Sequence, residues 1–259
     1  MANHALAALE TALRARKLDR TLTTALPPLE RVDPAALLPT GIDGLDGRLQ
    51  GGIPRGQLSE LAGPLTSGRT TLLLQMAAAV TRRGELAAIV DTFDRLDVAS
   101  AVAAGVDLER LLWIRLPASA PPSSHVERRA SADDAVDRVV GRALKALNLV
   151  LQAGGFALVA LDFADVPSST LKRIPFTTWL RVQRTIEGSD TACVLVVPEP
   201  VARSAGGLTL TLTGRAMWDG ATVRSRRLTG IDVGVRVVSP RRRVDGECRV
   251  RCGEPGLPV

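Results

Sequence analysis

Residues that build metal and nucleophile sites are scarce in this sequence of 259 amino acids. Its two histidines, His4 and His125, fall in predicted terminal or loop positions. This excludes a histidine-rich metal site and leaves no evident base for a hydrolase triad. The three cysteines are an odd number, and Cys248 and Cys252 lack the spacing of a metal knuckle. We therefore expect no metal and a reduced, cytoplasmic setting.

Long apolar runs are also missing. No stretch reaches the roughly 18 apolar residues of a membrane-spanning helix, so no such helix is expected. The amino terminus is interrupted by Glu10, Arg14 and Arg16, so we do not expect a signal peptide. At 46% hydrophobic and 23% charged residues, the composition is that of a globular chain with a sizeable core.

Charge is unevenly placed along the chain. The net charge of +6 lies entirely in residues 201–259, which hold 11 arginines and 5 acidic residues. This asymmetry indicates a polyanionic or acidic partner, although a solvated face in an arginine-rich chain is an equal alternative. Weak, non-specific DNA contacts are predicted at Arg224, Arg226, Arg227, Arg241, Arg242 and Arg243.

Aromatic residues for base stacking are few, because tyrosine is absent and only four phenylalanines and three tryptophans occur. Trp113 falls in a predicted core strand, Trp179 in a predicted helix and Trp218 near a predicted hairpin. None of the three forms an evident stacking platform, which is why the predicted DNA binding is weak.

Three segments are predicted. Residues 1–40 form an amphipathic helix, "ALAALETALRARK", and a connector, together an interaction arm whose leucines Leu6, Leu9, Leu13 and Leu18 contact a partner or the chain's own core. Residues 41–240 form the core, and residues 241–259 form a basic flexible tail.

The core alternates between strands and helices. Continuous apolar runs at 86–91, 111–116, 156–162 and 192–197 are typical of buried parallel strands. Helices are predicted at 69–83, 97–104, 131–152 and 176–187, with 163–175 as a loop. Alternating segments after residue 207 indicate antiparallel strands. The fold class is therefore α/β, a mostly parallel sheet flanked by helices with antiparallel strands at its carboxy-terminal edge.

The stretch 63-GPLTSGRTT-71 resembles the phosphate-binding pattern G-x-x-x-x-G-K-[ST]. Gly63, Gly68 and Thr70 match it, whereas Arg69 stands at the lysine position. The glycines allow a tight loop at a helix start, Thr71 extends the cap, and Asp162 ends a later strand at the same sheet edge. These residues either retain phosphate binding or keep only the strand–turn–helix; we favour the second.

The order of segments resembles the RecA family from about residue 5 to 240. The resemblance is carried by "TGIDGLDGRLQGGIPRGQLSELAGPLTSGRTTLLLQMAAA", "AAIVDTFDRLDVASAVAAGVDLERLLW" and "ALVALDF", in that order and spacing. It implies a RecA-like P-loop core. The family's lysine falls on Arg69, its catalytic glutamate on Phe93, and its nucleotide-sensing glutamine near Pro198 or Glu199. The family's DNA-binding loops fall on 163–175 and 198–207.

These departures predict a chain without a cofactor and without enzyme activity, because an arginine fork does not replace a slim lysine and phenylalanine cannot activate water. A RecA-like chain of this kind is similar to the ImuA family of mutasome accessory proteins. The resemblance implies an adaptor in damage-induced translesion synthesis that binds ImuB, an inactive Y-family-like polymerase homologue. An error-prone replicative-type polymerase, RecA and DNA are further implied partners. A SulA-type cell-division inhibitor and a weakly active ATPase are the alternatives.

Overall fold

The computed structural model describes residues 33–116, 132–202, 207–220, 222, 224–238 and 247–253. The chain divides into two units, Met1–Val32 and Asp33–Val259, and the described residues all belong to the second. The predicted partner-binding leucines Leu6, Leu9, Leu13 and Leu18 lie outside the described residues, as do Arg241, Arg242 and Arg243.

An eight-stranded sheet forms the centre of this unit, in the order β10-β9-β8-β3-β7-β6-β4-β5. Every pairing from β8 to β5 is parallel, and β9 and β10 continue the sheet antiparallel. A small antiparallel pair, β1 with β2, stands apart from it. The strands are β1 (Leu37–Leu38), β2 (Ile53–Pro54), β3 (Leu58–Ala62), β4 (Ala87–Asp91), β5 (Leu111–Arg115), β6 (Leu158–Asp162), β7 (Ala192–Val197), β8 (Thr209–Asp219), β9 (Arg227–Val238) and β10 (Glu247–Gly253).

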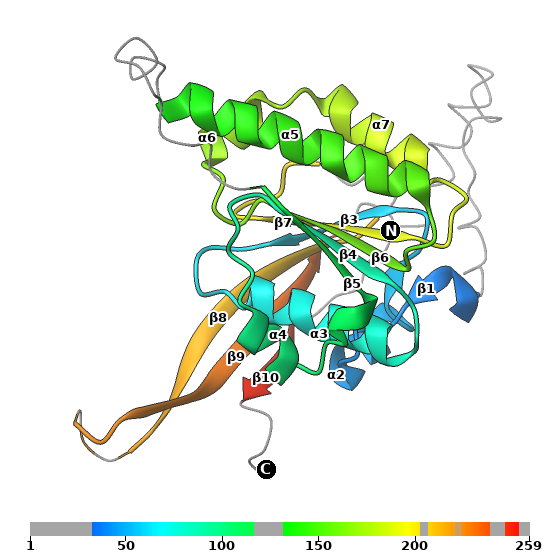
Figure 1. The fold of residues 1–259 in the computed structure, drawn as a ribbon. Coiled ribbons are helices and arrows are strands. Elements are labelled where there is room, and N and C mark those ends of the chain that lie inside the picture. Colours follow the sequence, from blue (N-terminus) through cyan, green and yellow to red (C-terminus); the bar gives the residue numbers. More distant parts are fainter. Residues whose placement is uncertain are drawn as a thin grey trace, which may run out of the picture. The chain divides into compact units, whose positions relative to one another are not determined.

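Helices cover both faces of the parallel part of the sheet. Figure 1 shows α5, α6 and α7 on one face and α2, α3 and α4 on the other. None of the helices in the described part of the chain combines the length and hydropathy needed to cross a membrane. The helices are η2 (Pro34–Ala36), α2 (Asp43–Leu49), α3 (Arg69–Arg82), α4 (Val98–Ala103), η3 (Leu108–Arg110), α5 (Ala132–Ala153), α6 (Ser168–Arg173) and α7 (Phe176–Ile186).

Side chains of each buried strand alternate between two hydrophobic clusters. In β7, for example, Val194 and Val196 face the cluster beneath α3, whereas Cys193, Leu195 and Val197 face the cluster beneath α5 and α7. All six residues of β7 are buried, as expected for a parallel strand covered on both faces. The predicted fold class is thus confirmed.

Two local expectations differ from the structure. The segment 163–175, expected to be a loop, contains the short helix α6, which begins after Pro167. Proline favours such a position because its fixed φ suits the entry to a helix. The expected flexible tail 241–259 contains β10, which pairs with β9. The composition of this segment could not reveal that its backbone N–H and C=O groups have partners in β9.

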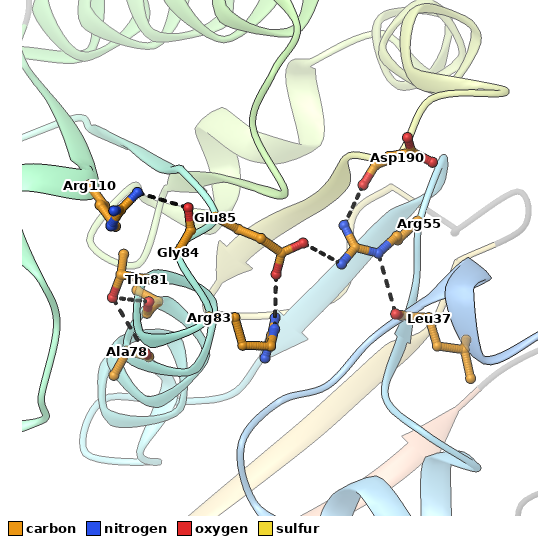
Figure 2. Close-up of polar contacts among 10 residues, drawn as sticks. Leu37, Arg55, Ala78, Thr81, Arg83, Gly84, Glu85, Arg110 and Asp190 are labelled. Carbon is orange, nitrogen blue, oxygen red and sulfur yellow. Dashed lines mark hydrogen bonds and ion pairs between the residues drawn. The ribbon is translucent and has the colours of Figure 1, made fainter.

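A network around Arg55 ties three segments together at the amino-terminal edge of the parallel strands (Figure 2). The guanidinium donates from Nε to the Leu37 carbonyl at 3.3 Å, from Nη1 to the Asp190 carbonyl at 2.7 Å, and from Nη2 to Glu85 Oε1 at 2.8 Å. Arg83 donates to the other Glu85 oxygen at 2.9 Å. Arg55 therefore joins the entrances of β4 and β7 to the β1–β2 pair.

Candidate phosphate-binding site at the end of strand β3

The loop between β3 and α3 can be built only from glycine at two positions. At Gly63 an added Cβ would lie 2.6 Å from the Leu212 carbonyl oxygen. Gly68 has φ of 87°, and an added Cβ there would lie 2.5 Å from Cγ2 of Val233. Leu212 and Val233 belong to β8 and β9, so these strands pack directly against the loop.

The first turn of α3 presents polar groups without a side-chain cap. Gly68 is the N-cap residue and makes no side-chain hydrogen bond to the helix. The hydroxyl of Ser67, which is 1% exposed, has no hydrogen-bond partner among the described residues. A helix amino terminus whose first N–H groups are not capped by a side chain fits a phosphate group.

Arg69 turns into the protein rather than toward solvent. It is 5% exposed, and its Nη1 donates to the Ala164 carbonyl at 3.4 Å. Burial lowers the pKa of this guanidinium, while the nearby charges of Asp162 and Asp165 oppose that shift. Its positive charge thus lies at the end of β6, close to the position of the phosphate-binding loop.

Asp162 ends β6 in an environment that disfavours its charge. The pKa of its carboxyl is raised from 3.8 to about 6, chiefly by burial and to a smaller extent by the charges of Asp91 and Asp165. A hydrogen bond from the Ala164 N–H to Oδ1, at 2.9 Å, and the Arg69 charge act in the opposite direction. Asp162 can therefore exchange a proton near neutral pH.

Asp91, at the end of β4, fixes the neighbouring turn. Its Oδ1 accepts the Arg95 N–H at 2.9 Å, and its Oδ2 accepts the Leu96 N–H at 2.8 Å and the Trp113 indole N–H at 3.0 Å. Phe93 in this turn is half-buried and packs against the hydrophobic cluster beneath α5 and α7. At the position where the RecA resemblance expects glutamate, the side chain thus joins the core.

A cavity of about 210 Å³ lies where these elements meet. Five of the six predicted nucleotide-site residues line it, namely Gly68, Arg69, Thr70, Thr71 and Asp162. Gly63 lies beneath the loop, against Ser67. Among the described residues, no group of three or more histidine, cysteine, aspartate or glutamate side chains is arranged to hold a metal ion. The residues present therefore fit a phosphate group better than a protein-held metal.

Glu60 is a polar anchor that the sequence analysis missed. It is 0% exposed in the middle of β3, and its Oε1 accepts the N–H groups of Val201 and Ala202, each at 2.8 Å. Its Oε2 accepts the Thr209 hydroxyl at 3.1 Å, and Ser59 Oγ accepts the Leu208 N–H at 3.1 Å. Strand β3 therefore binds both ends of the segment that connects β7 to β8. A carboxylate inside the apolar run "LSELAG" was the available signal.

A second contact joins the two segments on which the RecA resemblance places the DNA-binding loops. Lys172 of α6 pairs with Glu199 at 2.8 Å. Hydrogen bonds from Lys172 and then Ser168 lower the pKa of Glu199, with burial opposing them. The segments 163–175 and 198–207 are therefore linked across the carboxyl ends of β6 and β7.

The glycine loop between a parallel strand and a helix, with an aspartate ending β6, defines a P-loop-type α/β protein. A sequence model of the RecA N-terminal domain matches residues 28–153. Protein RecA of Tropheryma whipplei (strain Twist) is 30% identical over 213 residues, covering 80% of this chain and 47% of that protein. Protein RecA of Porphyromonas gingivalis is 28% identical over 212 residues, covering 80% and 60%. The chain is thus similar to RecA proteins over most of its length, and its residues 28–153 match the RecA N-terminal domain.

Shorter alignments agree with this assignment. Protein RecA of Nautilia profundicola is 38% identical over 117 residues, which cover 45% of this chain and 33% of that protein. The chain spans about half the length of the RecA proteins that it matches over most of its own length.

The expectation of a chain without enzyme activity is contradicted by these comparisons. The matched relatives are RecA proteins, and the RecA family is one of ATPases. The expectation weighed Arg69 and Phe93 as losses, although the loop, Ser67 and Asp162 still assemble around one cavity. Substitutions at two positions were too narrow a basis for excluding activity.

Proposed function

We propose that this chain acts in the cytoplasm as an ImuA-type accessory protein of damage-induced translesion synthesis. Its protein partner is an ImuB-like inactive Y-family polymerase homologue, and an error-prone replicative-type polymerase, RecA and DNA complete the assembly. The observation that carries the proposal is a RecA-like core with Arg69 beside Asp162 and with Phe93 packed into the core. A RecA-like scaffold that is changed at these positions suits a role that depends mainly on binding to other proteins and DNA.

The segment 1–40 is the proposed docking arm for the polymerase homologue, through the apolar stripe of Leu6, Leu9 and Leu13. At helical spacing these residues share one face, and such a face binds a groove on a partner protein. The test is binding of purified full-length chain to the purified polymerase homologue by calorimetry. Replacing all three leucines by serine should reduce the affinity at least about tenfold, because each removes buried apolar area.

The matched control replaces Ala8, Thr11 and Ala15 by serine, since the helical period assigns them to the opposite face of the predicted helix. We expect this control to bind as the unchanged chain does. Equal binding by the leucine variant would refute the docking role of residues 1–40. Absence of binding by the unchanged chain would refute the ImuB-dependent function itself.

Nucleotide-dependent activity is a second candidate, favoured by the 210 Å³ cavity that the loop and the first turn of α3 line. The loop N–H groups, Ser67 and Arg69 would hold the phosphates, and Thr70 and Asp162 line the same cavity. The test is ATP binding and turnover by the full chain. Thr70→Ala and Asp162→Ala should each abolish turnover, whereas Thr177→Ala, at an exposed position on α7, should leave it unchanged. Absence of ATP binding would exclude this candidate.

A further inference from the structure

The outer half of the β8–β9 hairpin projects beyond the rest of the described sheet (Figure 1). Its inner half is anchored in the core, where Leu210, Leu212, Val233 and Val235 are buried. Beyond the Arg215–Asp232 pair in the register, most side chains of both strands are exposed. We call the described residues between 215 and 228, namely 215–220, 222 and 224–228, the hairpin tip. The tip is thus an exposed extension that a buried base holds in place.

Positive charge dominates the hairpin tip. Residues 215–228 contain four arginines and one acidic residue, Asp219, a net charge of +3. Arg215, Arg224 and Arg226 are exposed and, within the described residues, form no ion pair with a carboxylate. Cations held together on a narrow element attract a polyanion.

Two large apolar side chains lie among these charges. Trp218 is 57% exposed, and Leu228, its partner in the strand register, is 48% exposed. Partners in register share one face of the hairpin, so Trp218 and Leu228 lie together. Arg224 and Arg226 lie in the turn between β8 and β9, just before β9 begins. The register shifts between Met217 and Trp218, which adds local twist at this point. The same end of the hairpin therefore exposes an indole and the guanidinium groups of Arg224 and Arg226 to solvent.

We propose that the hairpin tip binds single-stranded nucleic acid, with bases stacking on Trp218 and phosphates contacting Arg224 and Arg226. An exposed indole offers a flat surface to any unpaired base, and arginines neutralise the backbone without reading sequence. A duplex keeps its bases stacked inside, so only the charges of the tip would act on it. This site specifies the DNA partner of the proposed function and lies apart from the two segments that correspond to the RecA DNA loops.

The charge and the aromatic ring predict different observables. Neutralising about three phosphates on a single strand gives a slope of log affinity against log salt of about −2. Loss of base stacking on one aromatic side chain weakens single-strand binding by about five- to hundredfold. The first effect is shared by any polyanion, whereas the second requires unpaired bases.

The experiment measures fluorescence anisotropy of a labelled oligothymidylate titrated with the full-length chain. Trp218→Ala should weaken binding by about tenfold, and Trp218→Phe should restore most of it because the ring is retained. Phe176→Ala is the matched control, since Phe176 is 43% exposed on α7 and lies away from the tip. Its affinity should equal that of the unchanged chain.

Arginine substitutions test the electrostatic part. The double variant Arg224→Gln and Arg226→Gln should bind more weakly at low salt and lower the magnitude of the salt slope by about 1 to 2. Arg48→Gln, at an exposed position on α2, is the control and should keep the slope. A heparin competitor separates charge from stacking, because Trp218→Ala should leave heparin binding unchanged.

Each outcome decides for or against the proposal. The proposal is overturned if Trp218→Ala binds oligothymidylate as tightly as the unchanged chain does. It is also overturned if Trp218→Ala loses heparin binding and oligothymidylate binding to the same extent. The same variants are tested against the ImuB-like partner. Retained partner binding with lost oligothymidylate binding supports the proposal, whereas the reverse pattern makes the tip a protein-docking element and refutes it. Failure of the ImuB-type function is recognised separately, by absent partner binding in the unchanged chain.

Discussion

Replacing Asp162 by asparagine tests the electrostatics of the candidate site. Asparagine keeps an oxygen that can accept the Ala164 N–H, now 2.9 Å from Oδ1, but removes the charge. The fold raises the pKa of Asp162 from 3.8 to about 6, chiefly through burial. The substitution therefore removes a carboxylate that folding makes costly to ionise.

The magnitude follows from linkage between protonation and folding. One pKa unit corresponds to about 1.4 kcal/mol, so a shift of about two units corresponds to about 3 kcal/mol. Because the pKa is raised in the folded state, the favourable contribution is full below pH 3.8 and is lost as the pH rises through about 6. The unfolding free energy of the unchanged chain should fall by about 3 kcal/mol relative to Asp162→Asn between pH 4 and pH 7.

Urea unfolding at a series of pH values measures this difference, since midpoints and slopes give the free energy at each pH. Thr177→Ala is the control, because the exposed Thr177 carries no ionisable group and its difference should not change with pH. A constant difference between Asp162→Asn and the unchanged chain across this range would refute the proposed burial of charge.

Three further substitutions test packing and hydrogen bonding. Gly68→Ala should reduce stability by about 2 kcal/mol in thermal unfolding, because φ of 87° and the 2.5 Å approach to Val233 both oppose a Cβ. Glu60→Ala should cost about 3 kcal/mol in urea unfolding, because it leaves two buried N–H groups and a hydroxyl without their hydrogen-bond acceptor. Arg55→Ala should cost about 1 to 2 kcal/mol in urea unfolding. Arg55→Lys should not restore it, because the three contacts use three nitrogens of a planar fork and lysine has a single nitrogen.

Each of these has its own contradicting result. Val233→Ala should recover part of the loss in the Gly68→Ala background, and simple additivity of the two changes would contradict the steric explanation. Glu60→Gln keeps an acceptor oxygen and should lose less than Glu60→Ala; equal losses would contradict the hydrogen-bond explanation. Full recovery by Arg55→Lys would contradict the role of the guanidinium fork.

The sequence predicted the parallel core because its strands are continuous apolar runs. The run 192–197 coincides with β7, and the helix predicted at 69–83 ends one residue later than α3. The glycine pattern and Asp162 also predicted which residues line one cavity. Local sequence patterns are enough to predict an element when burial on both faces of a strand, or the caps of a helix, determine where that element lies.

Other features depend on contacts between distant segments. Glu60 binds N–H groups more than 140 positions away, and Arg55 reaches the Asp190 carbonyl 135 positions away. Neither partner is visible in a local window. Trp218 was discounted as a stacking residue because the sequence could not show how far β8 and β9 extend beyond the core. The structure gives it 57% exposure at the outer end of that hairpin.

The packing of β9 against the phosphate loop has a consequence for how this sequence can change over time. Gly68 can acquire a side chain only if Val233 becomes smaller, and Gly214 meets the Thr66 carbonyl so closely that an added Cβ would lie 2.0 Å from it. Substitutions in the loop and in the hairpin must therefore occur as coupled pairs. An alignment of related chains should show positions 68 and 233 varying together, even in chains whose loop no longer contacts phosphate.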